Sequence, residues 1–387
     1  MLGERVIPGV ERSAGISVYP GAGDTAQVLG YMERASQLGY REVFTSMHIT
    51  EQDPSGAVAF VEQVTKAAHR LGFRVIADIS PRAFRAVGAT PANLEPLERL
   101  GLNGIRVDFG YGPDEIASMT HSSSSMTVVV NASTVDVWAL SALRSSGADF
   151  SRMEACHNFY PRPETGLSMD FLCRTSSILK EHGLRVWAFV PSSTGRRGPL
   201  CQGLPTLERH RELPAARAAA ELLASGVVDV LLFGDPGASP GELESLSSIW
   251  LRGSVPLRVS LLPDAAGAER SVVFGGIHQN RPDPAEMVVR SAVSRDYAGK
   301  GADILPRSPA PRPAYTVTVD NRLYLRYSGE LQVTLTDLPP DPRVNVVGHV
   351  VEADRPLVNM LGPRSRFHFV EFTVTTGGSW NGTRSRF

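Results

Sequence analysis

The sequence has few cysteines and little net charge, and these shortages exclude several kinds of site. Its three cysteines, Cys156, Cys173 and Cys201, are an odd number and lack the spacing of a metal site. Such a set is typical of a reducing compartment. The formal net charge is -1, so no strongly basic domain is available to neutralise nucleic acid phosphates. We therefore expect no metal, no organic cofactor and no nucleic-acid partner.

Long apolar runs are also absent. The N-terminal sequence MLGERVIPGVERSAGISVYPG has charges where a signal peptide would need an apolar segment. No later run approaches the length that spans a membrane. These absences predict a cytoplasmic protein with no membrane partner, and they leave its oligomeric state open.

What is present up to about residue 250 is an alternation of β-branched runs with longer Ala- and Leu-rich segments, which is typical of βα units. Eight strands are predicted, at residues 15–20, 42–48, 74–80, 104–110, 127–133, 153–159, 185–191 and 229–235. Their number and spacing predict an α/β fold, the (β/α)8 TIM barrel. A doubly wound sheet is the alternative, but no Gly-rich dinucleotide-binding turn follows the first strand.

The sequence changes character after about residue 255, where strand-like pieces predominate and Asp320-Asn321 has the composition of a hairpin turn. A chain of 387 residues is too long for one ordinary domain. We predict a barrel domain at residues 1–255 and a smaller, mostly β domain at residues 256–372. Residues 373–387 lack apolar periodicity and are predicted to form a disordered tail.

Two acids stand near the ends of neighbouring strands, which is where the active site of a TIM barrel lies. Asp78 and Asp108 follow apolar runs of the third and fourth strands, and a buried acid needs a compensating interaction or a function. Two carboxylates at one mouth suit glycoside hydrolysis, one as acid and one as nucleophile or base. Alternatively, either Asp caps a helix or pairs with Arg106. No lysine occupies a strand end, which argues against a Schiff-base aldolase.

Three further strand ends carry polar or reactive side chains with less decisive meanings. Asn131 either donates a hydrogen bond to a substrate or forms a local turn. Asp235, within GDPG, is predicted to serve a turn. Cys156 is interpreted as a small buried residue rather than a nucleophile.

The segment CHNFYPRPETGLS follows the sixth strand and combines polar side chains with prolines at positions 161 and 163. Proline prevents a helix and stiffens the loop, so less conformational entropy is lost when a ligand binds. A stiff polar loop at the mouth predicts one wall of a ligand site. Its candidate residues are His157, Asn158, Tyr160, Arg162 and Thr165.

Residues 193–214 follow the seventh strand and contain the cations Arg196, Arg197, His210 and Arg211. Phosphate sites are frequent in this part of TIM barrels, and arginine binds phosphate or carboxylate through two parallel hydrogen bonds. The alternative is a solvated helical turn around ERHRE.

Together these motifs resemble the 6-phospho-N-acetylmuramidase family. The resemblance is carried, over most of residues 13–372, by GISVYP, DISPRAF, GIRVDFG, VVVNAST, ACHNFYPRPETGLS, RGPLCQGLPTLERHRELP, LLFGDPGAS, YSGELQV and VNVVGHVVEAD. It implies a TIM barrel followed by a cyclophilin-like β-barrel domain. It also implies a cytoplasmic hydrolase that cleaves 6-phospho-N-acetylmuramic acid from N-acetylglucosamine in peptidoglycan recycling. That substrate is a phosphorylated amino sugar with a lactyl carboxylate.

Matched by position, the resemblance assigns Asp78 and Asp108 to the acids of the third and fourth strand motifs. Its binding segments correspond to Asn131, His157, Asn158, Tyr160, Thr165, Gly166, Glu208, His210 and Arg211, to which we add Arg106 and Arg162. Gly237, where an aromatic residue is common, and the serine run at residues 119–127 depart from the family pattern. Another sugar-phosphate lyase or aldolase, or a non-catalytic sugar-phosphate sensor, remains an alternative.

Overall fold

The computed structural model describes residues 12–47, 54–122, 126–297 and 303–373. The chain divides between Gly253 and Ser254 into two compact units. His48 and, apart from residue 373, the predicted tail lie outside the described residues. None of the helices in the described ranges has the length and apolar character needed to cross a bilayer.

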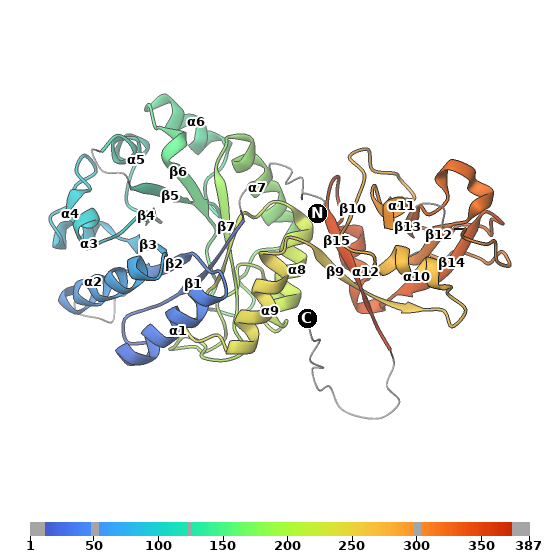
Figure 1. The fold of residues 1–387 in the computed structure, drawn as a ribbon. Coiled ribbons are helices and arrows are strands. Elements are labelled where there is room, and N and C mark those ends of the chain that lie inside the picture. Colours follow the sequence, from blue (N-terminus) through green and yellow to red (C-terminus); the bar gives the residue numbers. More distant parts are fainter. Residues whose placement is uncertain (1–11, 48–53, 123–125, 298–302, 374–387) are drawn as a thin grey trace. The chain divides into compact units, whose positions relative to one another are not determined.

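The first unit is a closed barrel of eight parallel strands that follow one another in sequence order (Figure 1). The strands are β1 (Ser13–Ser17), β2 (Glu42–Ser46), β3 (Arg74–Ile79), β4 (Gly104–Val107), β5 (Thr127–Asn131), β6 (Met153–Cys156), β7 (Arg185–Val190) and β8 (Val230–Phe233). The ring is closed because β1 pairs with β2 on one side and with β8 on the other. The predicted TIM barrel is thus confirmed.

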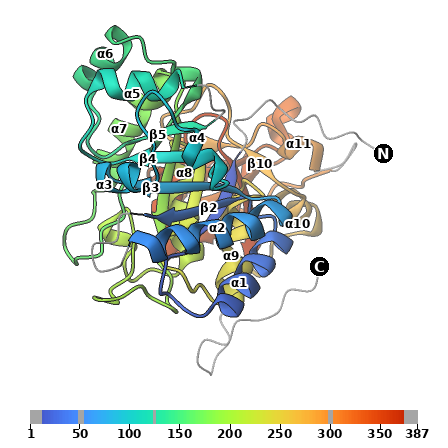
Figure 2. The ribbon, with the colours of Figure 1, turned by 90° about the vertical axis from the view of Figure 1, so that its left-hand side faces the viewer.

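Helices connect successive strands and surround the barrel (Figure 2). They are α1 (Thr25–Gln37), α2 (Pro54–Arg70), α3 (Pro81–Ala86), α4 (Glu95–Arg99), α5 (Pro113–Thr120), α6 (Val137–Ser145), α7 (Met169–Glu181), α8 (Ala215–Ser225) and α9 (Pro240–Trp250), with short 3-10 turns at Phe150–Arg152 and Glu208–His210. Capping side chains begin several of them; Asp24, Ser80 and Ser168 each accept a hydrogen bond from the first turn. Gly226, at φ 69°, ends α8 in the left-handed conformation that favours glycine.

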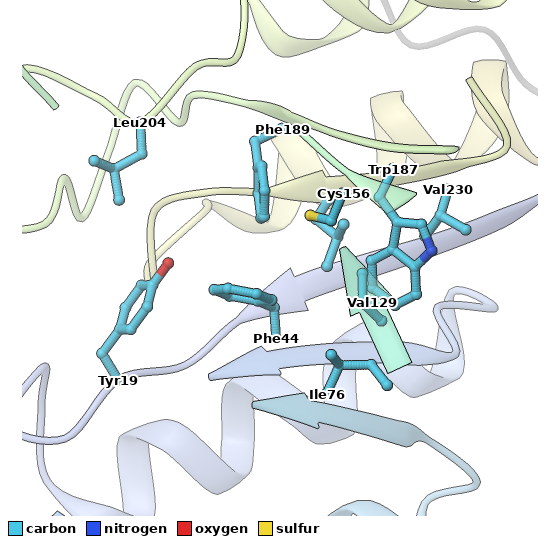
Figure 3. Packing of buried hydrophobic residues seen from close by; sticks show 10 residues of the cluster. Tyr19, Phe44, Ile76, Val129, Cys156, Trp187, Phe189, Leu204 and Val230 are labelled. Atoms are coloured by element: carbon cyan, nitrogen blue, oxygen red, sulfur yellow. The ribbon is translucent and has the colours of Figure 1, made fainter. Parts of the chain in front are cut away.

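The barrel interior is packed with large apolar side chains. Its cluster consists of Tyr19, Phe44, Ile76, Val129, Cys156, Trp187, Phe189, Leu204, Val230 and Leu232. Figure 3 shows Tyr19 at one end of this cluster and Trp187 at the other. Phe44 and Phe159 each meet the Phe189 ring edge to face, with centroids 5.2 Å apart. Because the interior is filled, polar groups that act on a ligand must lie at the strand ends.

The second unit is a mostly β domain with a seven-stranded sheet that forms a nearly closed barrel. The sheet order is β10 (His278–Gln279), β15 (Arg366–Glu371), β9 (Val255–Leu261), β14 (Val344–Val350), β12 (Thr316–Asp320), β13 (Leu331–Thr334) and β11 (Val288–Arg290). All neighbours are antiparallel except β15 and β9. The helices are α10 (Gly267–Phe274), α11 (Ser294–Tyr297) and α12 (Arg355–Asn359), with 3-10 turns at Arg322–Tyr327 and Glu352–Asp354.

The predicted hairpin is present as the antiparallel strands β12 and β13, but Asp320-Asn321 does not form its turn alone. β12 ends at Asp320, and Asn321 instead accepts a hydrogen bond from the amide of Leu323 and so caps the 3-10 helix Arg322–Tyr327. The chain then returns antiparallel along β13. An Asn side chain serves an N-cap as readily as a turn, so the local sequence did not separate the two.

Candidate active site

The two predicted acids share one guanidinium at the ends of β3 and β4. Arg106 Nη1 donates to Asp78 Oδ1 at 3.0 Å, and Arg106 Nη2 donates to Asp108 Oδ1 at 3.3 Å. The Arg106 side chain is 5% exposed, whereas those of Asp78 and Asp108 are 17% and 34% exposed. The acids therefore lie at the surface of the mouth with their common counter-ion beneath them. The pairing with Arg106 that the sequence left as an alternative is present.

Sheet register explains this arrangement. Asp78 of β3 is the direct neighbour of Arg106 on β4, so their side chains point the same way. Burial by itself lowers the pKa of Arg106, but the Asp78 carboxylate raises it, and the net pKa lies above the ordinary value for arginine. Arg106 is thus a permanent cation beside the two carboxylates.

Two asparagines complete this group. Asn131, at the end of β5, donates through Nδ2 to Asp108 Oδ1 at 2.6 Å. Asn158, just after β6, accepts a hydrogen bond through Oδ1 from Arg106 Nη2. We call Asp78, Arg106, Asp108, Asn131 and Asn158 the Arg106 cluster. Four consecutive strands, β3 to β6, contribute to it, which is a typical construction for a TIM-barrel active site.

His157 supports the cluster from below and does not reach a ligand, because it is completely buried. Its ring nitrogens contact two hydroxyls, Ser133 Oγ at 3.2 Å and Ser176 Oγ at 2.9 Å. Ser133 Oγ in turn accepts a hydrogen bond from the Asn158 amide at 3.0 Å. Burial lowers the pKa of His157 to about 3, so the ring is neutral. We correct its predicted ligand contact to a positioning role.

Glu208 holds the loop after β6 in place. Its carboxylate accepts hydrogen bonds from the amides of Glu164, at 2.9 Å, and Gly166, at 2.8 Å. A Cβ atom on Gly166 would lie 2.6 Å from the Glu208 nitrogen, so the two loops touch through backbone atoms. The backbone of Tyr160 adds a bond to the Pro205 oxygen at 2.9 Å. The stiffness that the prolines predicted therefore has a second source, a bracket to the loop after β7.

Arg211 completes this bracket. Its Nε and Nη2 atoms donate to the two Glu208 oxygens at 2.7 and 2.6 Å, a bidentate pair. These bonds, with those from the amides of residues 164 and 166, lower the pKa of Glu208 to about 2. Arg211 also donates to the carbonyl oxygens of Arg162, Gln202 and Gly203. The predicted substrate contacts of Gly166, Glu208 and Arg211 are therefore replaced by contacts within the protein.

His210 is likewise unavailable to a ligand. It is fully buried, and its Nε2 atom lies 3.1 Å from Glu221 Oε2 on α8. Burial lowers its pKa, which favours the neutral ring. An anion-binding role for His210 is wrong because neither its charge nor its position serves an external anion.

The remaining predicted residues lie on the loop itself. Thr165 Oγ1 donates to the Arg162 carbonyl at 2.7 Å and so closes a tight turn. Tyr160 is half-buried, and Arg162 is exposed. The Arg162 guanidinium has no acidic partner among the residues that the structure describes. Among the predicted residues of this loop, Asn158 and Tyr160 are half-buried and Arg162 is exposed, so these side chains are accessible to a ligand.

Asp235 and Cys156, which the sequence predicts to serve a turn and to fill the interior, are both buried. Asp235 is buried and accepts hydrogen bonds from the amides of Ser192, Arg197 and Leu204, at 2.9 to 3.1 Å. Cys156 lies in the apolar interior (Figure 3), where burial raises the pKa of its thiol to about 12. In the described ranges, no group of three or more His, Cys, Asp or Glu side chains is placed to hold a metal ion.

Ser133 was missed by the sequence reasoning. It links His157 to Asn158, and the only signal for it is its place two residues after Asn131 in VVVNAST. Its amide also donates to Asn131 Oδ1 at 2.9 Å. Asn131 therefore forms the local turn that was one alternative for it and also contacts Asp108.

Known proteins resemble the chain along most of its length. Residues 14–248 match a family model described as 6-phospho-N-acetylmuramidase, N-terminal, and residues 255–370 match 6-phospho-N-acetylmuramidase, C-terminal. A crystal structure of an uncharacterized B. cereus protein is 32% identical, covers 93% of this chain and 100% of its own, and has a TM-score of 0.77. A conserved protein of unknown function from Enterococcus faecalis is 34% identical over 93% of this chain and 96% of its own, with a TM-score of 0.63. No curated protein matches the sequence.

Proposed function

The chain belongs to the 6-phospho-N-acetylmuramidase family, and we propose that it is a glycosidase that releases 6-phospho-N-acetylmuramic acid from N-acetylglucosamine. The observation that carries this proposal is the pair of carboxylates, Asp78 and Asp108, gathered on the Arg106 guanidinium at the mouth of the barrel. Most glycoside hydrolases use two carboxyl groups that flank the scissile bond. Peptidoglycan recycling in the cytoplasm is the process that such a reaction would serve.

The different surroundings of the two acids suggest different roles. Asp78 is the less exposed of the two and lies closer to Arg106, at 3.0 Å against 3.3 Å for Asp108. A carboxylate held firmly by a buried cation is well positioned to act as the nucleophile or base. Asp108 is the more accessible of the two, at 34% against 17% exposure, and we propose that it gives the proton to the leaving oxygen. Asp78 is then the nucleophile or base.

The rim residues suit the anionic part of this substrate. Arg162 carries a cation without an acidic partner among the described residues, and Tyr160 lies two residues before it on the same loop. A phosphate or a lactyl carboxylate would supply the missing acceptors. Asn131 and Asn158 would orient the sugar through the side-chain N–H groups that they do not use to bind Asp108 or Arg106.

An aryl glycoside of 6-phospho-N-acetylmuramic acid, compared with the disaccharide, tests both the activity and the roles. An activated leaving group departs without protonation, so an acid variant should retain much more activity on the aryl glycoside than on the disaccharide. We expect this of Asp108→Asn, while Asp78→Asn should lose both activities. The opposite pattern would exchange the roles, and no hydrolysis of either compound by the wild-type protein would refute the proposed function.

A non-catalytic sugar-phosphate sensor is the second candidate. It is favoured by the pairing of both acids with Arg106, since a binding protein has no need of a free carboxyl group. A sensor would bind the phosphorylated sugar without converting it. Calorimetric binding of the intact disaccharide, followed by recovery of that disaccharide unchanged after long incubation, would identify this function.

A further inference from the structure

Arg197 presents a second cation at the same end of the barrel. It follows β7, and its amide donates to Asp235 Oδ1 at 3.0 Å. Its guanidinium carbon lies 4.0 Å from the centre of the Tyr19 ring, beyond the end of β1. The Tyr19 hydroxyl donates to the Gly234 oxygen, beyond β8, at 3.0 Å. Three adjacent strand ends thus fix the position of Arg197.

The neighbouring arginines form ion pairs with acidic side chains, whereas Arg197 forms none with the described residues. Arg196 pairs with Glu212, and Arg211 pairs with Glu208. Arg197 has no acidic partner in the part of the chain that the structure describes. The carboxylate next to it, Asp235, already accepts three backbone amides. A half-buried guanidinium stacked on an aromatic ring, with its donors unused, is suited to a planar or tetrahedral anion.

The alternative anion site in this region is filled by the protein. The N-terminus of α9 lies where many TIM barrels bind phosphate. Here the Glu242 carboxylate accepts the amides of Ser193, at 2.7 Å, and Ser239, at 2.9 Å. An external anion would have to displace this carboxylate, so the helix end offers it nothing. Arg197 is therefore the better candidate to bind an anion on this side of the mouth.

The position of Arg197 also fits the shape of the substrate. In the ring of eight strands, β7 and β8 lie opposite β3 and β4, which carry Asp78 and Asp108. In a sugar 6-phosphate, the phosphate is several bonds away from the anomeric carbon that the acids must reach.

We propose that Arg197 binds the phosphate of the substrate and selects phosphorylated over unphosphorylated sugar. This assignment rests on the proposed function for its choice of substrate. It also leaves Arg162, on the loop after β6, to bind the lactyl carboxylate of the substrate. Arg197 is a binding residue for the far end of the sugar and takes no part in bond cleavage.

Steady-state kinetics of Arg197→Met on phosphorylated and unphosphorylated aryl glycosides test the proposal. We expect kcat/KM for the phosphorylated compound to fall roughly 10- to 100-fold, mainly through KM, because a charge-assisted pair is lost. Activity on the unphosphorylated compound should stay within about twofold of wild type. Arg174→Met, which removes an exposed arginine from α7, is the matched control and should change neither value. An equal fall on both compounds, or no fall on either, overturns the proposal.

A binding measurement separates this proposal from the proposed function. Glucosamine 6-phosphate should raise the thermal unfolding temperature of the wild type and of Arg174→Met, but not that of Arg197→Met. If the wild type hydrolyses nothing and this pattern still appears, the phosphate site stands and the glycosidase fails. If the sugar phosphate protects Arg197→Met as well as the wild type, the site fails. If the Met variant does not fold, Arg197→Lys replaces it, because lysine keeps the charge but lacks the parallel N–H donors of the guanidinium. A sugar phosphate that raises the unfolding temperature of this variant as much as that of the wild type overturns the proposal.

Discussion

Arg106 donates a 3.0 Å hydrogen bond to Asp78, its direct neighbour in the barrel sheet. The guanidinium is nearly inaccessible, yet Asp108 shares it and Asn158 also accepts a hydrogen bond from it. Arg106 therefore holds both acids and the start of the loop after β6 in position. Removing this one cation should disturb the stability and the chemistry together.

Arg106→Met should be strongly destabilising. It leaves two partly buried carboxylates without their counter-ion, a change that costs about 3 kcal/mol or more. Urea unfolding measures the loss, and Arg106→Lys, which keeps the charge, should recover part of it. A Met variant as stable as the wild type would show that Arg106 does not hold the acids.

His157→Gln should lower activity without altering the shape of its pH profile between pH 5 and 8. The ring is neutral there because burial lowers its pKa to about 3. Its loss releases Ser133 and so misplaces Asn158, which should cost between about 10- and 100-fold in kcat/KM. A limb near pH 6.5 that disappears in the variant would instead identify His157 as an acid or base.

Glu208→Gln should destabilise the protein in a pH-dependent way. The pKa of Glu208 falls from 4.5 to about 2 in the folded protein, so its contribution is complete above pH 4.5 and disappears as the pH drops towards 2. The difference in unfolding free energy between wild type and variant should be about 1–3 kcal/mol at pH 7 and shrink below pH 4.5.

Glu212→Gln is the control for Glu208, because Glu212 is 72% exposed in its pair with Arg196. A surface ion pair of this kind contributes little, so this variant should match the wild type at every pH. If the effect of Glu208→Gln were independent of pH, the ionised bracket would not be its cause.

Gly166→Ala should loosen the loop that follows β6. The new Cβ would meet the Glu208 nitrogen at 2.6 Å, and backbone cannot move aside as a side-chain end can. We expect lower thermal stability and a raised KM. Gly241→Ala, in α9, has nothing within 4 Å of its added Cβ and should be neutral or slightly stabilising. Equal behaviour of the two variants would remove the case for close contact between the loops.

The order of the elements could be predicted from the sequence because each strand is a short apolar run and each helix an amphipathic one. Asp78 and Asp108 could be predicted to lie close together because parallel strands end at one face, but the contact of Asn131 with Asp108 was not predicted. The strand ends were less accurate: β1 spans Ser13–Ser17, ahead of the predicted 15–20. The pair of short helices after β3 was not anticipated, because Pro81 and Gly88 interrupt a periodic segment.

The sequence did not predict which of the basic side chains form ion pairs within the protein. Whether an arginine is free depends on tertiary partners, and Glu221, the partner of His210, lies on α8. Arg197 and Arg211 lie in similar polar segments of the sequence. In the structure Arg211 pairs with Glu208, whereas Arg197 stacks on Tyr19, a residue far away in the sequence. The i,i+3 spacing of Glu208 and Arg211 was the one local hint of their pairing.

Hydrolysis of the disaccharide of 6-phospho-N-acetylmuramic acid and N-acetylglucosamine tests the central claim most directly. Release of N-acetylglucosamine should be measured for wild type, Asp78→Asn and Asp108→Asn, with folding of each checked by thermal unfolding. We expect turnover by the wild type and a loss of at least about 100-fold in each folded variant. Normal turnover in both folded variants would contradict the carboxylate pair, and no turnover by the wild type would contradict the function itself.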